Sequence, residues 1–501
     1  MKMLSLPEKN KRLKRLFHPE SVAFIGASNK RGKWGSIILA NLINGGFTGA
    51  IYPINPSEAQ IQGLGAYKRI ADVPDIPDLV VIVVPPQAVP AVIAECVAKG
   101  VQVGVVITAG FAEVGTEGER LQREMVKQAH AGGMLLVGPN CNGIMSPPEK
   151  LHVAMPPIYF PPGPMAVVAQ SGNVATSIAR RAMKRGFGIS RFVSSGNEAD
   201  LHCEDYYTYL SEDPDTRVIL SYIEGFRDGR RFFAAAKEVT RKKPIIMLKA
   251  GATRIGAKAA KSHTAAMAGS DLAFEGVCSQ AGVIRAGNMD DLTNIAAGFV
   301  GQPLPAGRRV GIVTAGGGWG VLAADACAEA GLEVPALSKE TIQELDEFLP
   351  AWWSRNNPVD LVAGLKPDHL EKSLECLLRC LTIDGILLLG IMPALPLDPL
   401  PSSAGPEAVE ERCQVLLETI GEVFDKFMGL AHHYQKPVII ASELPFSVEN
   451  LESLLSGKSG KPDGPYAGAE GLCLLSQPGR RRNRHGQPGR LWGISQIVNS
   501  P

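Results

Sequence analysis

Residues 164–186 read PMAVVAQSGNVATSIARRAMKRG, and this stretch decides the fold. The apolar run MAVVA predicts a buried strand, because continuous short apolar runs are typical of parallel strands that are covered on both faces. The tight turn QSGN follows, and apolar residues at helical spacing come after it. The stretch therefore predicts the strand, turn and helix that begin a parallel α/β unit.

Similar apolar runs precede this stretch, and each ends in Gly, Pro, Ser or Asn. They are SVAFIGAS (21–28), AIYPINP (50–56), LVVIVVPP (79–86), VGVVITAGF (103–111) and MLLVGPNCNG (134–143). With a helical pattern over 34–42, they predict a Rossmann-like β-α-β-α-β domain whose ligand crevice lies at the carboxyl ends of the strands. LHVAMPPIYFPPGP (151–164) is interpreted as a proline-rich linker.

The plan of the opening stretch recurs at 308–334, RRVGIVTAGGGWGVLAADACAEAGLEV, and NNPVDL (356–361) stands where the earlier unit has GNEADL (196–201). Such self-similarity indicates a pseudo-repeat of two flavodoxin-like units. We therefore expect an α/β protein with domains at 1–148, 160–300 and 305–450. Residues 451–501, rich in Gly, Pro and Arg, are expected to be irregular. A native extension and a shifted reading frame both fit that composition, and RRRNR (480–484) stays open as a basic patch.

Composition narrows the class of protein. The 501 residues carry a formal net charge of +1, which gives no general attraction for nucleic acid. No apolar run reaches the ~18 residues of a membrane span, and the N-terminal stretch lacks the apolar core of a secretion signal. The nine cysteines show no metal-ligand spacing, as expected for reduced thiols in a cytoplasmic protein.

The stretch KAGATRIGAKAAKSHTAAMAGSDLAFEGV (249–277) links a predicted strand, PIIML (244–248), to a helix expected near Asp271. A connection of this length without periodicity is usually functional. It carries four cations before Asp271, namely Lys249, Arg254, Lys258 and Lys261, and one histidine, His263. A histidine among cations and small residues suits a group that meets an anion and then moves.

Three turns are candidates for holding phosphate, because the free amides and dipole of a helix N-terminus favour anions. The first follows SVAFI at Gly26, Ala27 and Ser28, with Lys30, Arg31 and Lys33 close by. The second is Gln170, Ser171, Gly172 and Asn173, and the third contains Gly316 and Gly317. Glu224, at the end of VILSYIEG, is placed to accept a hydrogen bond from a histidine ring and so fix its tautomer.

Other catalytic patterns are missing from the sequence. GASNKRGKWG (26–35) is not GxGxxG, and IYPINP has no acidic residue for a ribose diol, which argues against a nicotinamide dehydrogenase. The sequence has no GxSxG, HExxH or GxxxxGK[ST] pattern. Any phosphoryl chemistry must therefore run through a side chain or be completed by another chain.

Together, these motifs resemble one family from about Leu16 to Glu449. The motifs are FIGASNKRGKWG, IYPINP, VPP, ITAGF, GPNCNG, AQSGNVA, SSGNEADL, YIEGF, KSHTAAMAGSD, QAGVIR, TAGGGWGVLAADA and NPVDL. The chain is similar to the CoA-binding α part of NDP-forming acyl-CoA synthetases, the ADP-forming acetate–CoA ligases of the succinyl-CoA synthetase superfamily. The resemblance implies a Rossmann-like CoA-binding domain followed by two succinyl-CoA-synthetase-like domains.

The resemblance also implies an activity: acyl-CoA, ADP and phosphate give the acid, ATP and CoA. It implies that His263 becomes phosphorylated, that Glu224 orients it, and that the QSGN turn holds phosphate. CoA contacts are implied at Gly26, Ala27, Ser28, Lys33, Asn55, Pro85, Thr108, Ala109 and Asn140. No metal is expected on this chain, because ADP or ATP with Mg would bind an ATP-grasp β subunit.

Two functions remain open at this stage. The chain is either a catalytic α subunit that works with an ATP-grasp partner or a non-catalytic module that senses acyl-CoA. The presence of His263 favours the first, because a sensor has no need of a nucleophile. Neither the acid nor the choice between ADP and GDP follows from the sequence, and neither nucleic acid nor membrane is expected as a partner.

Overall fold

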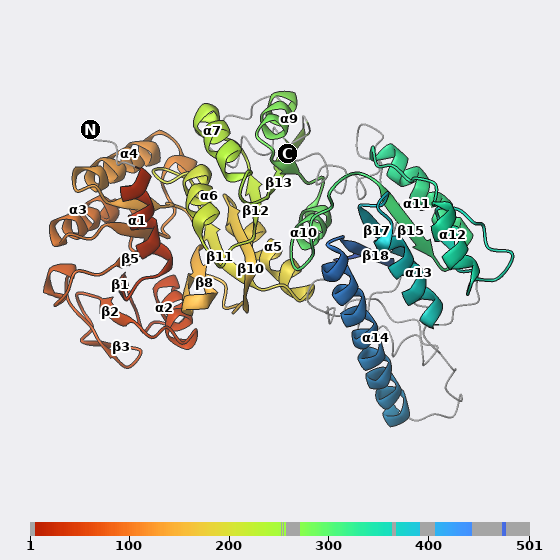
Figure 1. Ribbon diagram of the computed structural model, residues 1–501. Helices are drawn as coiled ribbons and strands as arrows, with labels where there is room; N and C mark the ends of the chain where they lie inside the picture. The colour runs from red at the N-terminus through yellow and green to blue at the C-terminus, as the bar shows by residue number, and fades with distance from the viewer. Residues whose placement is uncertain are drawn as a thin grey trace. The chain divides into compact units, whose positions relative to one another are not determined.

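The structure is a computed structural model that describes residues 6–251, 253, 255–256, 271–362, 367–390, 406–442 and 473–476. The chain divides into two compact units. The first consists of Met1–Met183 with Phe187–Arg285, and the second of Lys184–Gly186 with Ala286–Pro501. Figure 1 traces both units along the chain.

The first unit begins with a five-stranded parallel sheet in the order β2-β1-β5-β6-β7. Alternate residues of β1 point to opposite faces, so Val22 and Phe24 share a core with α1 and α2, and Ala23 and Ile25 share one with α3 and α4. The sheet is buried on both sides, as predicted for a Rossmann-like domain. The strands are Ser21–Ile25 (β1), Ala50–Ile54 (β2), Leu79–Ile82 (β5), Val103–Val106 (β6) and Leu135–Val137 (β7), and the helices are Leu6–Phe17 (α1), Trp34–Asn44 (α2), Val89–Lys99 (α3) and Thr116–Ala131 (α4).

Short elements fill the connections of this domain. They are the hairpin strands Gln60–Ile61 (β3) and Leu64–Gly65 (β4) and the 3₁₀ turns Ile70–Asp72, Pro86–Ala88, Ala112–Val114 and Pro147–Glu149.

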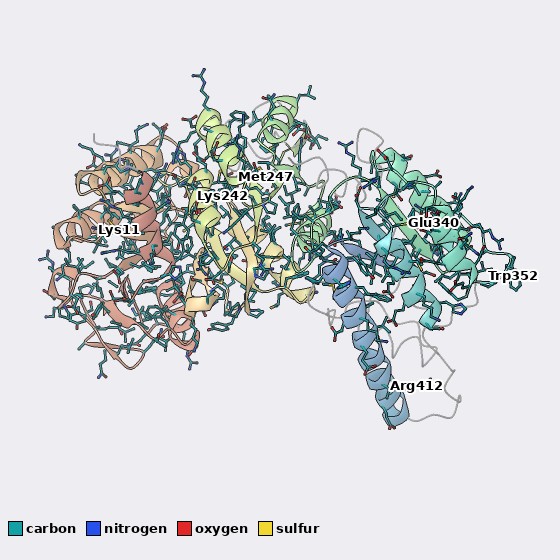
Figure 2. The ribbon with its side chains drawn as sticks, viewed as in Figure 1. Lys11, Lys242, Met247, Glu340, Trp352 and Arg412 are labelled. Atoms are coloured by element: carbon teal, nitrogen blue, oxygen red, sulfur yellow. The ribbon has the colours of Figure 1, made fainter. Side chains whose placement is uncertain are left out.

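A second sheet in the same unit has the order β14-β13-β12-β10-β11-β8-β9, and its first five strands are parallel. Helices α6, α7 and α9 pack on one face, where Val168, Ile219 and Met247 belong to the buried core. Met247 is labelled in Figure 2. The strands are Gly143–Ser146 (β8), Leu151–Ala154 (β9), Pro162–Ala169 (β10), Ile189–Ser194 (β11), Val218–Ile223 (β12), Ile245–Lys249 (β13) and Ile284–Arg285 (β14), and the helices are Gly172–Lys184 (α5), Cys203–Glu212 (α6), Gly229–Val239 (α7) and Asp271–Gln280 (α9).

The predicted proline-rich linker is in part a strand. Its first four residues, Leu151–Ala154, form β9, which pairs antiparallel with β8, and β8 pairs antiparallel with β11. All four residues are buried, so pairing satisfies their backbone groups where water does not reach. The prediction of a linker was wrong at these positions, because LHVA contains a polar histidine and runs directly into the prolines of MPPIYFPPGP.

The second unit contains a parallel sheet in the order β16-β15-β17-β18-β19. Helices α12, α13 and α14 share a core with one face of this sheet, and α11 shares one with the other. The strands are Val310–Thr314 (β15), Val359–Asp360 (β16), Gly385–Leu389 (β17), Val438–Ser442 (β18) and Cys473–Ser476 (β19), and the helices are Met289–Gly298 (α10), Gly317–Glu329 (α11), Lys339–Asp346 (α12), Pro367–Arg379 (α13) and Pro406–Tyr434 (α14).

The two flavodoxin-like sheets share one strand order, as the pseudo-repeat predicts. The order β11-β10-β12-β13-β14 in the first unit matches β16-β15-β17-β18-β19 in the second. In this match β19, Cys473–Ser476, takes the place of β14. We expected residues 451–501 to be irregular, and for these four residues that expectation was wrong, because they pair in parallel with β18. The rest of that segment lies outside the described residues.

Three further findings concern the described residues as a set. None of their helices is both long enough and apolar enough to cross a membrane. No group of three or more His, Cys, Asp or Glu side chains among them is arranged to hold a metal ion. The cysteines described as free thiols are buried: Cys96, Cys141, Cys203, Cys278, Cys327, Cys376 and Cys380.

Candidate functional site

The candidate site forms where β10, β11 and β12 of the first unit end side by side. Gln170 follows β10, Ser195 follows β11 and Glu224 follows β12. Because the strands are parallel and in register, their carboxyl ends meet at one edge of the sheet. The two predicted features QSGN and Glu224 therefore lie together.

The Gln170 side chain joins these three strand ends. Its Oε1 accepts hydrogen bonds from the backbone N–H groups of Glu224, at 2.6 Å, and Gly225, at 3.3 Å. Its Nε2 donates to the Gly225 carbonyl and to Glu198 Oε2, both at 2.9 Å. The backbone amides can only donate, so they fix which end of the carboxamide faces them.

One carboxylate oxygen of Glu224 is a hydrogen-bond acceptor without a described donor. Its Oε2 is buried and has no hydrogen-bond partner among the described residues. A buried acceptor without a partner costs about 1–3 kcal/mol, so native structures keep such atoms rarely and usually for a purpose. The histidine ring N–H that the sequence predicts at this position would satisfy it.

The QSGN turn leads directly into α5. The Ser171 carbonyl accepts the hydrogen bond from the Ala175 amide, which places Ser171 at the N-cap position. Gly172, the first residue of α5, lies against the loop of the GPNCNG motif: a Cβ at Gly172 would come within 2.1 Å of the Asn142 side-chain amide carbon. A glycine is therefore required for this turn to reach its neighbour.

Replacing Gly172 with Ala should destabilise the protein, because the added methyl group forces Asn142 or the turn to shift. Overpacking of this kind typically costs about 1–3 kcal/mol. Thermal unfolding measures the effect. Gly229→Ala is the matched control, since Gly229 also begins a helix, α7, and its added Cβ would meet nothing within 4 Å. Equal melting temperatures for the two variants would show that the close approach at Gly172 has no consequence.

Glu198 belongs to this site, although the sequence did not single it out. Its side chain is buried, and its Oε1 accepts a hydrogen bond from the Ser195 hydroxyl at 2.7 Å. Burial raises the pKa of Glu198 to about 7, against the opposing effect of the hydrogen bonds from Ser195 and Gln170. Its position directly after a Gly-Asn turn was the signal available in SSGNEADL, but the sequence does not reveal burial.

At the carboxyl end of β13, beside the candidate site, charged side chains surround Asp271. Asp271 Oδ1 lies 2.7 Å from Arg285 Nη2 and 3.8 Å from Lys249 Nζ. Lys249 is buried, and burial lowers its pKa while Asp271 opposes the change. Lys249 precedes and Asp271 follows the segment predicted to carry the phosphorylated residue. His263 itself, with Arg254, Lys258 and Lys261, lies outside the described residues.

The residues predicted to contact CoA lie along the carboxyl ends of the first sheet. Asn55 Nδ2 donates to the Ala27 carbonyl at 2.8 Å, Thr108 Oγ1 donates to the Val84 carbonyl, and the Asn140 amide donates to the Thr108 carbonyl. With the Val83 amide, which donates to the Ile25 carbonyl, these bonds tie the ends of β1, β2, β5, β6 and β7 into one rim, the edge predicted as a ligand crevice.

The glycine turn after β1 differs in detail from the prediction. α2 begins at Trp34, which confirms the helical pattern predicted over 34–42, so Gly26-Ala27-Ser28 does not itself open this helix, as its interpretation as a phosphate-binding helix start requires. The glycine turn and the start of α2 still lie in contact, because a Cβ at Gly35 would lie 2.0 Å from the Gly26 carbonyl oxygen. Gly26 itself has φ +92°. The intervening segment carries Lys30, Arg31 and Lys33 on the exposed surface.

The third glycine turn has a different neighbour. Gly316 is the N-cap of α11 in the second unit, and a Cβ at Gly317 would lie 2.9 Å from Asp360 Oδ2. A carboxylate at a helix N-terminus competes with any anion that binds there. The Gln170 turn is therefore the better of the two for holding phosphate.

Comparisons with known proteins give the same organisation. Family models match residues 20–147 as a CoA binding domain, residues 162–299 as a succinyl-CoA ligase like flavodoxin domain and residues 310–416 as a ligase-CoA domain. The α subunit of the ADP-forming acetate–CoA ligase II of Pyrococcus furiosus is 41% identical over 379 residues, which cover 75% of this chain and 82% of that protein.

Two longer matches extend over most of the chain. The ADP-forming acetate–CoA ligase I of Archaeoglobus fulgidus is 36% identical over 497 residues, covering 93% of this chain and 71% of that protein. The dinucleotide forming acetyl-coenzyme A synthetase 1 of Ca. Korarchaeum cryptofilum, solved with phosphate and ADP, matches with a TM-score of 0.78 and 31% identity, covering 97% of this chain and 96% of that one.

Proposed function

The chain belongs to the family of ADP-forming acetate–CoA ligases, and from this premise we propose that it is the α subunit of an ADP-forming acyl-CoA ligase that transfers phosphate through His263. The net reaction converts acyl-CoA, ADP and inorganic phosphate into the carboxylic acid, ATP and CoA. An ATP-grasp β subunit supplies the site for the nucleotide and its Mg, and the chain works in the cytoplasm.

The reaction divides into three transfers, and atoms balance in each. A phosphate oxygen attacks the thioester carbon, so the C–S bond breaks and CoA leaves as the thiol. The neutral His263 ring then attacks phosphorus in the acyl phosphate, and the carboxylate leaves. Finally ADP takes the phosphoryl group from His263. Covalent capture replaces one transfer between distant sites with two short ones.

Glu224 is the observation that carries this proposal. Its buried Oε2, without a partner among the described residues, would accept the N–H of the His263 ring, so that the other nitrogen is free to attack. The N-terminus of α5, with Gly172 packed on Asn142, supplies amides for the phosphate oxygens. A module that only senses acyl-CoA has no use for an unsatisfied carboxylate at this position.

The residues of the first sheet fit CoA. Asn55 stands where a dinucleotide site would carry an acidic residue, and its side chain is used to bind the Ala27 carbonyl and the Ser57 amide. Lys30, Arg31 and Lys33 are exposed beside this rim and offer charge to several phosphates. We propose that CoA binds there through Gly26, Ala27, Ser28, Lys33, Asn55, Pro85, Thr108, Ala109 and Asn140.

An assay of ATP formation tests whether both subunits are needed for the reaction. With acyl-CoA, phosphate, ADP and Mg, the chain alone should form no ATP, and adding an ATP-grasp protein encoded beside it should start the reaction. The same mixture with the partner alone is the control. ATP formation by either protein by itself would contradict the two-subunit proposal.

A further inference from the structure

Glu198 combines two unfavourable features that a merely structural turn would avoid. Its backbone has φ +50°, the left-handed region, which costs a residue other than glycine about 1–2 kcal/mol. Its carboxyl group is buried at 2% exposure, where charge is disfavoured. Strained backbone and buried acids together are typical of functional positions.

The hydrogen bonds of Glu198 lead to the proposed phosphate site. Glu198 Oε2 accepts from Gln170 Nε2, and Gln170 Oε1 in turn accepts from the backbone amides of Glu224 and Gly225. The described acceptors of Gln170 Nε2 are thus Glu198 and the Gly225 carbonyl. Without Glu198, the carboxamide loses one of the two hydrogen bonds that its Nε2 donates.

The turn that carries Glu198 is held firmly on its other side. Asn197 Nδ2 donates to Glu113 Oε2 at 2.5 Å, and Asn140 Nδ2 donates to Asn197 Oδ1 at 3.2 Å. A Cβ at Gly196 would come within 2.3 Å of the Pro139 carbonyl oxygen. These contacts fix the turn in place, so the Glu198 carboxyl group can hold the Gln170 side chain in one orientation.

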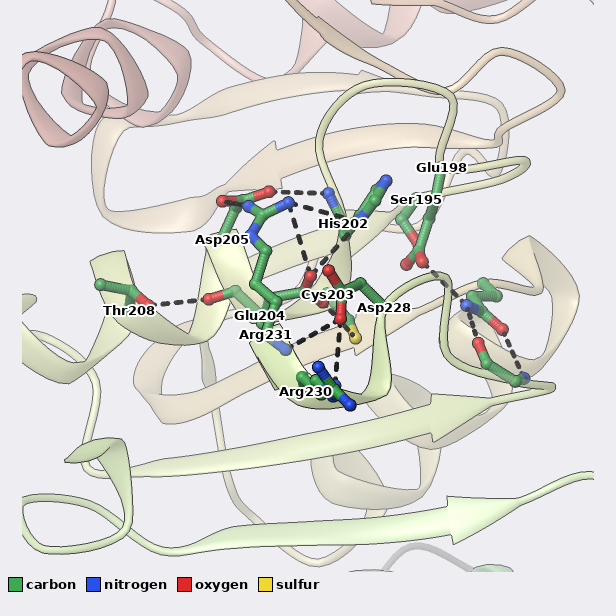
Figure 3. Close-up of polar contacts among 12 residues, drawn as sticks. Ser195, Glu198, His202, Cys203, Glu204, Asp205, Thr208, Asp228, Arg230 and Arg231 are labelled. Carbon is green, nitrogen blue, oxygen red and sulfur yellow. Dashed lines mark hydrogen bonds and ion pairs between the residues drawn. The ribbon is translucent and has the colours of Figure 1, made fainter. Parts of the chain in front are cut away.

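We infer that Glu198 is a positioning residue, which holds the Gln170 carboxamide so that Gln170 fixes the start of α5 and the Glu224 backbone relative to each other. This role rests on the proposed function, in which Glu224 orients His263. The Ser195–Glu198 turn lies next to the charged cluster around His202 (Figure 3). Glu198 does not touch the reacting atoms in this account.

The groups around Glu198 are compatible with either charge state. His202 lowers its pKa and Glu204 raises it, through space. His202 Nδ1 lies 3.2 Å from Glu204 Oε1, so the two opposite effects on the pKa of Glu198 come from neighbouring side chains. The other titratable groups that respond to the charge of Glu198 belong to α6: Cys203, Tyr206 and Tyr207. When Glu198 takes up a proton, it can donate to Ser195 Oγ while that hydroxyl turns to the Ala169 carbonyl at 3.4 Å.

Substitutions that keep size but change hydrogen bonding test the role. Glu198→Met fills the space, removes the buried charge and leaves Gln170 Nε2 with the Gly225 carbonyl as its one described acceptor, whereas Glu198→Gln keeps an acceptor oxygen. With acyl-CoA and labelled phosphate, Glu198→Met should form phosphohistidine about tenfold or more slowly, with the KM for acyl-CoA unchanged. Glu198→Gln should stay within about threefold of the original chain at pH 6, as expected for one retained neutral hydrogen bond.

The pH dependence adds a readout that a structural role would not move. The side chain introduced by Glu198→Gln cannot ionise. The labelling rate of the unsubstituted chain, divided by the labelling rate of Glu198→Gln at the same pH, should therefore rise as the pH passes through about 7, where Glu198 loses its proton. Any ionisation of His263 cancels in this ratio. At a fixed pH, Glu204→Ala is the matched control for the rate of labelling, because it removes another buried carboxylate near Glu198, on α6, without touching Gln170.

Crystal structures of the variants separate this inference from the proposed function. In Glu198→Met the Gln170 carboxamide should leave the amides of Glu224 and Gly225, and in Glu198→Gln it should stay. If Gln170 keeps both bonds in Glu198→Met, or if Glu204→Ala slows labelling as much, the positioning role is overturned. If the unsubstituted chain takes no label, the proposed function fails, while the position of Gln170 still decides the role of Glu198.

Discussion

His263→Asn should abolish phosphate labelling of the chain, with a loss of at least about a thousandfold, the scale seen when a covalent nucleophile is removed. Asparagine retains polarity but has no ring nitrogen that can attack phosphorus. The purified chain is incubated with acyl-CoA and labelled phosphate, and the acid-labile label on the protein is measured. CoA binding should be unchanged, because the proposed CoA residues lie on the other sheet of the first unit.

A second histidine provides the control for this variant. His202 lies on the segment that also carries Glu198, but its Nδ1 faces Glu204 Oε1 at 3.2 Å, in a charged cluster with Arg231. His202→Asn should therefore keep its label. Label that persists in His263→Asn, or disappears equally in His202→Asn, would contradict the assignment.

Glu224→Gln should slow phosphohistidine formation by about a hundredfold or more, within the range for loss of one proton-transfer partner. The substitution keeps the shape of the side chain but replaces one carboxylate oxygen with an amide group that donates. Because Oε2 is the buried atom without a described partner, the histidine ring would lose its acceptor or meet a second donor. The ring would then be held in the wrong tautomer, or not held at all.

The measurement is the single-turnover rate of labelling at saturating acyl-CoA. The KM for acyl-CoA should stay constant, since Glu224 acts after binding. Glu238→Gln on α7, an exposed carboxylate paired with Arg241, is the neutral comparison. A Glu224→Gln chain that labels at the normal rate would remove Glu224 from the mechanism.

The sequence predicted the sheets well because their strands are buried on both faces. Runs such as LVVI at β5 are apolar at every position, and the turns after them contain the glycines and asparagines that parallel strand ends use. Two strands were not predicted, although they are as long as β5. LHVA (β9) runs into a proline-rich stretch and CLLS (β19) lies in a stretch rich in Gly, Pro and Arg, so only pairing with β8 and β18 identifies them as strands.

The candidate site was predictable where one motif carries the chemistry. Gln170 and Glu224 follow the ends of two predicted strands, and in the structure the Glu224 backbone amide donates to Gln170 Oε1 at 2.6 Å. Glu198 was not predicted as a site residue, because its role comes from burial and not from its residue type. Its burial depends on contacts among β10, β11 and the loops of the first sheet. Similarly, the approach of Gly35 to the Gly26 carbonyl arises between residues that a spacing rule treats as unrelated.

A chase experiment tests most directly the claim that this chain carries phosphate between two sites. The chain is labelled with acyl-CoA and radioactive phosphate, freed of small molecules, and mixed with ADP, Mg and the ATP-grasp partner. We predict that the label maps to His263 and passes into ATP in a single turnover. Label that stays on the protein, maps to another residue or leaves only as inorganic phosphate would contradict the account.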